Sequence, residues 1–169
     1  DGLALEGGLE AAKANKKLVA GLDTSTPFNL ATYEAPYIVY KDGYYYMFVS
    51  SGSCCEGLNS TYHVRVGRST DPLGPYYDDQ GRDMCGENRG AVVLQASADF
   101  VGVGHNAVIQ DDAGNWYIVY HGFDTDKPGT YGNSNRRSLL IDKLEWDGDF
   151  PQTKDKIAGK SGMPLPVIK

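Results

Sequence analysis

Long hydrophobic runs and an excess of basic charge are both missing from this sequence. Its apolar stretches, such as residues 91–94, are far shorter than the roughly 20 residues that cross a bilayer, so we expect a soluble protein with no membrane partner. Lys and Arg number 16 against 22 Asp and Glu, which gives a net charge of −6. Because such a chain has no basic field to hold phosphates, we expect no nucleic-acid partner, and a neutral ligand suits it better.

Cysteine is scarce, with three residues, and none has the spacing of a metal-binding motif. No C-x-x-C pair occurs, which disfavours a zinc site with His63, and nothing places a histidine against a thiol to make a Cys-His nucleophile. Cys54 and Cys55 are neighbours whose Cα atoms lie about 3.8 Å apart, closer than the roughly 4.4–6.8 Å of a relaxed disulfide. A bridge between them would be strained, whereas pairing Cys85 with either leaves the other free. The sequence therefore leaves the pairing open.

Glycine and tyrosine are abundant, at 21 and 12 residues, and the apolar residues come in short runs between turn signals. This pattern is typical of many short strands and not of long helices. Two aromatic and β-branched runs, residues 37–40 and 44–49, flank Lys41-Asp42-Gly43, and an Asp-Gly turn between such runs is a strong hairpin signal. A third run, residues 62–69, ends at a turn rich in proline and glycine. We therefore predict three antiparallel strands in this part of the chain.

The same order of elements returns further along the chain. A predicted hairpin at residues 107–120 and a third strand at 138–146 repeat the earlier pattern, and Gly43 and Gly114 stand 71 positions apart. A repeated antiparallel sheet unit of several tens of residues indicates a β-propeller, in which each unit is one blade. A closed ring needs at least about four blades, so we expect these units to be part of an incomplete propeller.

Glu34 and His105 are the candidate site residues that the repeat singles out, because each stands just before a first strand and the two are 71 positions apart. The innermost strands of a propeller line its channel, so equivalent positions on adjacent blades converge there. Aromatic and apolar neighbours would desolvate Glu34 and favour its protonated form, which protonation of a leaving group requires. A surface carboxylate for Glu34 and a core histidine for His105 are the alternatives. We interpret His121 as structural, and Arg137 as either a core arginine or a channel arginine paired with a carboxylate.

A series of ordered motifs runs from about residue 33 to residue 151. They are Glu34-Ala35-Pro36-Tyr37-Ile38, Tyr44-Tyr45-Tyr46-Met47-Phe48-Val49-Ser50, Ser53-Cys54-Cys55-Glu56-Gly57, Ser60-Thr61-Tyr62, Val66-Gly67-Arg68-Ser69, Gly74-Pro75-Tyr76, Val103-Gly104-His105-Asn106, Trp116-Tyr117-Ile118-Val119-Tyr120-His121 and Arg137-Ser138-Leu139-Leu140-Ile141-Asp142. In this order the motifs resemble glycoside hydrolase family 43. The Cys-Cys-x-Gly and Ser-Thr-Tyr pieces resemble its endo-α-1,5-arabinanases in particular.

The resemblance implies an all-β, five-bladed β-propeller, of which residues 33–169 would form the last two to three blades after a connecting segment or blade remnant at residues 1–32. It also implies inverting hydrolysis of α-1,5-linked arabinofuranose chains, in which a carboxylic acid protonates the glycosidic oxygen and a carboxylate on the other face activates water. Glu34 falls on the family's general acid. His105 falls on the histidine beside a channel metal, expected to be a calcium ion, whose oxygen ligands would include water.

The resemblance also implies substrate contacts and a compartment. Cys54 and Cys55 would form a rigid wall beside the arabinan polysaccharide or oligosaccharide, and Asn106 would be a further substrate contact. The sequon Asn59-Ser60-Thr61 fits a secreted, extracellular protein. Two other functions remain open: an exo-acting arabinofuranosidase or β-xylosidase of the same family, and a non-catalytic carbohydrate-binding or interaction module.

The sequence departs from the family pattern at several places. The family's general base and the aspartate that orients the acid both precede the Glu-Ala-Pro motif, and Asp1 and Asp23 match neither position. Ser53 and Glu56 replace larger and basic residues beside the cysteine pair, and residues 83–90 differ from the usual Gly-rich loop, which leaves the subsite preference open. We therefore expect the base to come from absent sequence, from a second chain or from a second copy that completes the propeller.

Overall fold

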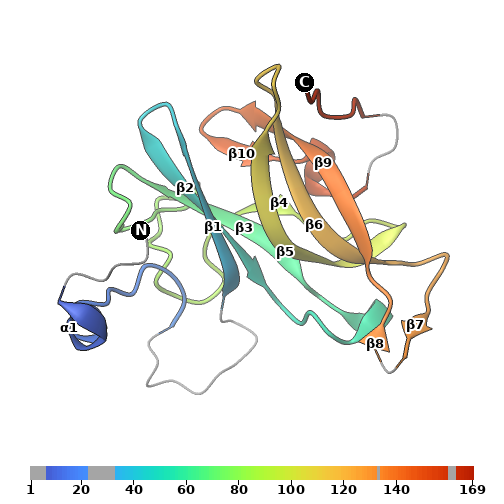
Figure 1. The fold of residues 1–169 in the computed structure, drawn as a ribbon, viewed down its shortest axis with the longest axis horizontal. Helices are drawn as coiled ribbons and strands as arrows, with labels where there is room; N and C mark the ends of the chain where they lie inside the picture. Colours follow the sequence, from blue (N-terminus) through green and yellow to red (C-terminus); the bar gives the residue numbers. More distant parts are fainter. Residues whose placement is uncertain (1–6, 23–32, 133, 160–162) are drawn as a thin grey trace.

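The computed structural model contains two four-stranded antiparallel sheets that lie side by side, with one short helix, α1 (Gly8–Ala14), apart from them (Figure 1). It describes residues 7–22, 33–132, 134–159 and 163–169. Half of the predicted connecting segment, residues 1–6 and 23–32, lies outside the described residues. In the part of the chain that is described, no helix is both long and apolar enough to cross a membrane.

The first sheet consists of β1 (Glu34–Lys41), β2 (Tyr44–Ser51), β3 (His63–Ser69) and β4 (Ala91–Leu94), in that order. Asp42 and Gly43 both have positive φ, 49° and 89°, which is the requirement of a tight type I′ hairpin turn. The predicted hairpin and third strand are therefore confirmed. The structure adds β4 at the edge, a strand of four residues that is too short for its hydrophobic pattern to reveal.

The second sheet consists of β5 (Phe100–Gln110), β6 (Trp116–Asp124), β9 (Ser138–Asp147) and β10 (Phe150–Gln152), again in chain order from one edge to the other. A small pair, β7 (Thr130–Tyr131) and β8 (Ser134–Asn135), lies in the loop before β9. Short 3-10 helices span Gly57–Asn59 and Lys154–Lys156. The predicted repeat of hairpin plus third strand is confirmed, and β10 is an addition whose central proline fits an edge strand.

The two sheets repeat each other, but the repeat distance is not the same in every strand. Glu34 pairs with Ser50 in the first sheet, and Gly104 pairs with His121 in the second. Ser50 and His121 are 71 positions apart, as predicted, whereas Glu34 and Gly104 are 70 positions apart. The predicted equivalence of Glu34 with His105 is therefore wrong by one residue, because the turn of the second hairpin is one residue longer.

The main hydrophobic core lies between the two sheets. Phe48, Val64 and Val66 of the first sheet and Ile118 and Tyr120 of the second are at most 1% exposed and belong to one cluster. Burying each such side chain contributes on the order of 1.5–3 kcal/mol. This shared core holds the inner strands β1 and β5 against each other, and the candidate site lies at the start of β1 and the middle of β5.

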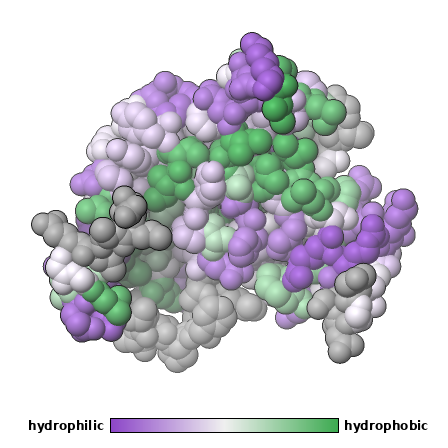
Figure 2. All heavy atoms as spheres, in the orientation of Figure 1, coloured by the Kyte–Doolittle hydropathy of each residue, from purple (hydrophilic) through white to green (hydrophobic). Residues whose placement is uncertain are grey.

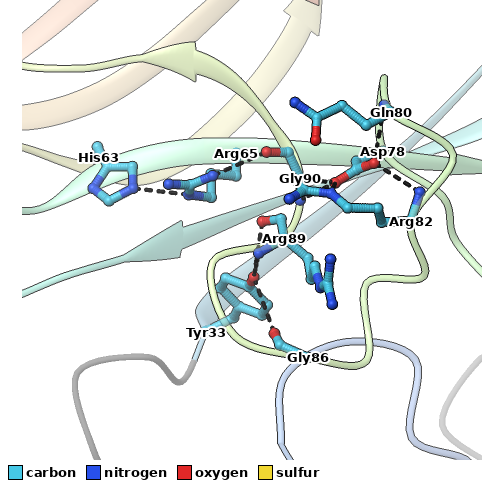
Figure 3. Close-up of polar contacts among 9 residues, drawn as sticks. All are labelled: Tyr33, His63, Arg65, Asp78, Gln80, Arg82, Gly86, Arg89 and Gly90. Atoms are coloured by element: carbon cyan, nitrogen blue, oxygen red, sulfur yellow. Dashed lines mark hydrogen bonds and ion pairs between the residues drawn. The ribbon is translucent and has the colours of Figure 1, made fainter.

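Asp78 organises the long loop between β3 and β4 (Figure 3). Its buried carboxylate accepts hydrogen bonds from the backbone N–H groups of Gln80, Arg82 and Gly90, and from Arg82 Nε at 2.9 Å. Burial by itself would raise the pKa of Asp78, but the hydrogen bonds from Arg82, Gly90 and Gln80 outweigh it and hold the pKa below the usual range. The loop is thus closed around a charged carboxylate.

This loop covers a smaller apolar cluster on the other face of the first sheet. Tyr33, just before β1, packs against the cluster, and its hydroxyl accepts a hydrogen bond from Arg89 N–H at 2.7 Å and donates one to Arg89 O at 2.8 Å (Figure 3). The start of β1, and with it Glu34, is thereby attached to the loop. The buried members of the cluster are Met47, Val49, Tyr76 and Met84.

Both sheets also expose apolar side chains. On β1, Ile38 and Tyr40 are 45% and 59% exposed, and on β9, Leu139 is 81% exposed. Figure 2 shows apolar residues gathered in a band across the middle of the face on view. The described residues therefore leave part of the apolar surface of the two sheets uncovered.

Candidate active site

Glu34 and His105 lie beside matching irregularities in the two inner strands. The pairing of β1 with β2 shifts just after Glu34, and the pairing of β5 with β6 shifts just after Gly104. Ala35 and His105 are the residues with positive φ in these bulges, at 51° and 54°. A bulge bends a strand and redirects its side chains. The two irregularities therefore set the directions of the side chains at the start of β1 and in the middle of β5.

Tyr62 connects Glu34 to the core. The Tyr62 hydroxyl donates a hydrogen bond to Glu34 Oε1 at 2.6 Å, and Tyr62 is only 1% exposed. Burial and this bond to the carboxylate raise the pKa of Tyr62, so its hydroxyl remains a donor at neutral pH. Gly104 makes room for the ring, since a Cβ at that position would lie 2.4 Å from two Tyr62 ring carbons. Glu34 itself is exposed, so the described residues do not supply the desolvation that its sequence neighbours suggest.

His121 continues the contact from Tyr62 to His105. Its ring stacks on Tyr62 with centroids 5.8 Å apart and on His105 with centroids 6.2 Å apart. Burial, together with the positive charge of Arg137, lowers the pKa of His121 to about 4, so the imidazole is neutral at neutral pH. The four side chains Glu34, Tyr62, His121 and His105 form a continuous series, which we call the acid–imidazole row. The structure thus brings both predicted site residues into one cluster.

Ser50 and Asn106 surround the bulge at His105. Ser50 is fully buried, and its Oγ accepts a hydrogen bond from His105 N–H at 2.9 Å. Asn106 is 6% exposed, and within the described part of the chain neither atom of its side-chain amide has a hydrogen-bond partner. An unsatisfied buried polar group costs about 1–3 kcal/mol, so the Asn106 amide has unused capacity for a ligand or a water molecule.

The cysteine loop lies beside this cluster. Cys54 and Cys55 are joined by a disulfide and Cys85 is a free, exposed thiol, so the structure decides the pairing that the sequence left open. Arg137 Nη2 donates to the backbone oxygen of Cys54 at 3.2 Å and to Cys55 Sγ at 3.3 Å. The Arg137 guanidinium also lies over the Phe123 ring, 5.0 Å from its centroid. Arg137 therefore links the segment before β9 to the disulfide. It is exposed, so it is not the core arginine that was one of the two expectations, and its described hydrogen-bond partners include no carboxylate.

The two residues that depart from the family pattern beside the cysteines hold the loop closed. Ser53 Oγ donates to Glu56 Oε2 at 3.1 Å, and Ser53 N–H donates to Thr61 Oγ1 at 3.0 Å. The backbone N–H groups of Thr61 and Tyr62 both donate to Ser53 O. The cysteine loop is thus bonded directly to Thr61 and to Tyr62, the residue that contacts Glu34.

The surroundings of His105 bear on the expected calcium ion. Among the described residues, no three His, Cys, Asp or Glu side chains lie close enough together to hold a metal ion. Calcium takes roughly six to eight oxygen ligands, and the row supplies a single carboxylate at Glu34. The described residues therefore do not form a calcium site by themselves. Asp1 and Asp23, the two aspartates that precede Glu34 and match neither family position, lie outside the described residues.

Tyr62 is a site residue that sequence reasoning did not single out, and His121 is one that it interpreted as structural. Each occurs within a motif that carries the family resemblance, Tyr62 at the end of Ser60-Thr61-Tyr62 and His121 at the end of the run that begins at Trp116. The available signal for both residues was therefore their place at the end of such a motif. What the sequence does not show is that two rings on different sheets stack against each other.

Comparisons with known proteins identify the family of this chain. The family described as glycosyl hydrolases family 43 matches residues 4–151. The chain is 39% identical over 127 residues to an extracellular exo-α-(1→5)-L-arabinofuranosidase of Cellvibrio japonicus. It is 35% identical over 125 residues to extracellular endo-α-(1→5)-L-arabinanase 1 of Bacillus subtilis. These alignments cover 75% and 74% of this chain but 34% and 35% of the relatives, so the chain spans about a third of their length.

Solved structures show the same fold. The structure of Cellvibrio cellulosa α-L-arabinanase complexed with arabinohexaose superposes with a TM-score of 0.69 at 36% identity, over 82% of this chain and 44% of that one. The predicted class, an all-β chain of the five-bladed propeller type, is confirmed, and the two sheets are two of its blades. A family match over residues 4–151, together with this shared fold, shows that the chain belongs to glycosyl hydrolase family 43.

Proposed function

We propose that this chain is part of a glycosidase that degrades arabinan by inverting hydrolysis of α-1,5-linked L-arabinofuranosyl chains. The family membership and the names of the relatives support the reaction class and the substrate. The observation that carries the proposal is the hydrogen bond from Tyr62 to Glu34 Oε1, at the exposed end of an inner strand. It holds one oxygen of an accessible carboxyl group and leaves the other free for a ligand.

In this proposal Glu34 is the general acid. Because Tyr62 occupies Oε1, the proton would be carried on Oε2 and delivered to the glycosidic oxygen as the bond to the anomeric carbon breaks. A water molecule would attack that carbon from the opposite face and lose its proton to a second carboxylate roughly 6.5–9.5 Å away. The Tyr62 hydroxyl would then stabilise the negative charge left on Glu34. We assign the second carboxylate to no described residue.

Neighbouring side chains would contact the substrate. The Cys54–Cys55 disulfide, with Arg137 bound to it, would form a firm wall, because the bridge and the guanidinium restrict the loop. The unsatisfied amide of Asn106 would bind a sugar hydroxyl or a bound water. His105 would face a hydrated calcium ion in the channel, with the remaining oxygen ligands supplied by water and by parts of the propeller outside this chain.

Further blades, from the same protein or from a second chain or copy, would complete the ring. The exposed apolar residues Ile38, Tyr40 and Leu139 support this, because in a propeller each blade packs its faces against its neighbours. Secretion is also part of the proposal, since the two curated relatives are named extracellular proteins. An extracellular location also agrees with the disulfide between Cys54 and Cys55.

Hydrolysis of debranched arabinan by the protein with its complete propeller tests the role of Glu34. We expect Glu34→Gln to lower the rate by about 100-fold or more, because the amide cannot donate the proton of a general acid. Glu145→Gln is the matched control, since Glu145 is an exposed glutamate on β9 away from the row, and it should keep the parent rate. Equal, low rates for the parent and both variants would favour a non-catalytic carbohydrate-binding module.

The products separate the two enzymatic alternatives. Short arabino-oligosaccharides released early in the reaction would indicate endo action, as in the Bacillus subtilis relative's name. Release of arabinose alone would indicate exo action, as in the name of the Cellvibrio japonicus relative. Activity on xylo-oligosaccharides but not on arabinan would instead support a β-xylosidase.

A further inference from the structure

A second cavity lies where the two sheets meet, at the strand ends opposite Glu34. Its volume is about 560 Å³. β1 starts at Glu34 and ends at Lys41, so the start of β2 and the end of β3, which line the cavity, lie at the far end of the blade. The turn between β9 and β10 closes the other side. Because the two described sheets supply its walls, the cavity needs no further blade to form.

One wall of this pocket is aromatic and held in place. The Arg68 guanidinium lies 4.5 Å from the centroid of the Tyr44 ring and 5.0 Å from that of Phe150, and Arg68 Nη2 binds Asp149 Oδ2 at 2.8 Å. Tyr77 is 44% exposed, and its backbone exchanges two hydrogen bonds with Arg68, of 2.9 and 2.8 Å. The pocket thus presents an open tyrosine ring on a backbone that is already ordered.

The rest of the rim is polar. Asp71 binds Leu73 N–H through Oδ1 at 2.8 Å, which leaves Oδ2 able to accept a hydrogen bond, and Thr70 adds a hydroxyl. Asp79 is exposed and makes no hydrogen bond or ion pair with any described residue. Its position is nevertheless defined, because Asp78 beside it anchors the loop (Figure 3). Carboxylates and hydroxyls of this kind accept the hydrogen bonds that sugar hydroxyls donate.

The chemistry of the lining distinguishes among possible ligands. The acidic residues disfavour a phosphate or another anion. They also do not converge on one point, since no metal-binding group of three occurs among the described residues. An exposed tyrosine beside acceptors and a guanidinium matches a neutral sugar, whose apolar face stacks on the ring while its hydroxyls bind the polar rim.

We propose that this pocket is a second carbohydrate-binding site, separate from the acid–imidazole row, and that its ligand is a linear arabinan oligosaccharide. The choice of arabinan as the ligand rests on the proposed function. The pocket itself, and the match between its lining and a neutral sugar, are independent of that function. The eight residues of β1 separate the two sites by roughly 25 Å. A polymer bound at the second site stays near the row, which raises its effective concentration there.

Amide chemical shifts in a titration with arabinohexaose test the proposal. The Glu34→Gln chain is used so that the ligand is not cleaved, and xylohexaose is titrated in parallel. We expect saturable shifts at the amides of Thr70, Gly74 and Gly81. Tyr77→Ala should weaken binding at these positions about tenfold or more, whereas Tyr77→Phe should keep it because the ring is retained. Tyr40→Ala is the matched control, an exposed tyrosine outside the pocket, and should leave binding unchanged.

The outcomes separate this inference from the proposed function. Shifts confined to Gly104, His105 and their neighbours would overturn the second site and leave the hydrolytic proposal standing. Shifts in the pocket but none at the row would support the second site and count against the proposed function. Pocket shifts with xylohexaose but not arabinohexaose would overturn arabinan as the ligand. An absence of pocket shifts with both sugars, or an equal loss of binding in Tyr40→Ala and Tyr77→Ala, would overturn the site altogether.

Discussion

Replacing Tyr62 with phenylalanine isolates the contribution of one hydrogen bond to the proposed chemistry. Tyr62→Phe removes the hydroxyl that donates to Glu34 Oε1 at 2.6 Å and keeps the buried ring that fits against Gly104. A hydrogen bond to a charged group is worth about 1.5–3 kcal/mol, and because Glu34 is exposed we discount this to about 1 kcal/mol. The rate constant kcat/KM on debranched arabinan should therefore fall about five- to tenfold.

The stability of the same variant should change little. Water can replace the lost donor at the exposed Glu34, so Tm should fall by no more than about 2–4 °C. Tyr120→Phe is the matched control, because the hydroxyl of Tyr120, another buried tyrosine, donates to a carboxylate, that of Asp142 in the other sheet. It should cost about 1–3 kcal/mol of stability, since Asp142 is buried, without a specific loss of rate.

Kinetics and thermal melts of Tyr62→Phe and Tyr120→Phe decide between a role in the site and a role in the fold. If Tyr62→Phe retained the parent kcat/KM, its hydroxyl would not position the acid and the reasoning about Oε1 would be wrong. If the two variants lost rate in proportion to their loss of stability, the hydrogen bond to Glu34 would be structural.

Three further changes test other parts of the structure. Gly104→Ala should lower Tm and reproduce the rate loss of Tyr62→Phe, since overpacking costs about 1–3 kcal/mol, while Gly129→Ala, which has open space around it, should change neither. The pKa of Asp78 is lowered in the folded state, so its carboxylate stabilises the fold above its usual pKa, and this stabilisation is lost as pH falls through the pKa of the folded state. Asp78→Asn should therefore lower Tm at pH 7. The variant should also show a smaller fall in Tm than the parent between about pH 5 and pH 3. Calcium should raise the Tm of this chain by less than about 2 °C relative to EDTA, because the described residues hold no ligand cluster, and a larger rise that His105→Ala abolishes would contradict this.

Local signals in the sequence predicted the hairpins well, whereas the ends of the sheets could not be predicted. Asp42-Gly43 specifies its turn because both residues tolerate positive φ, and that preference is local. The edge strands β4 and β10 have four and three residues, so they carry too few alternations to be recognised. Their place depends on pairing with β3 and β9, which is a property of the folded sheet.

The candidate site could also be predicted only in part from the sequence. The repeat and its motifs were enough to single out Glu34 and His105, but counting residues placed them at equivalent positions, and the longer second turn shifts the inner strand by one. The contact between them runs through Tyr62, just before β3 of the first sheet, and His121, on β6 of the second. Their stacking depends on how closely two blades pack, which no local pattern of residues encodes.

The sequence by itself determined the kind of structure and singled out two candidate site residues, Glu34 and His105. Its turn signals, its short aromatic runs and its internal repeat specify antiparallel blades, because each depends on neighbouring residues and on strand periodicity. Only the tertiary structure decided which groups meet: the pairing of Cys54 with Cys55, the hydrogen bond from Tyr62 to Glu34, and the pocket at the opposite strand ends. These contacts join residues from separate strands and loops, so they exist only once the two sheets have packed around their shared core.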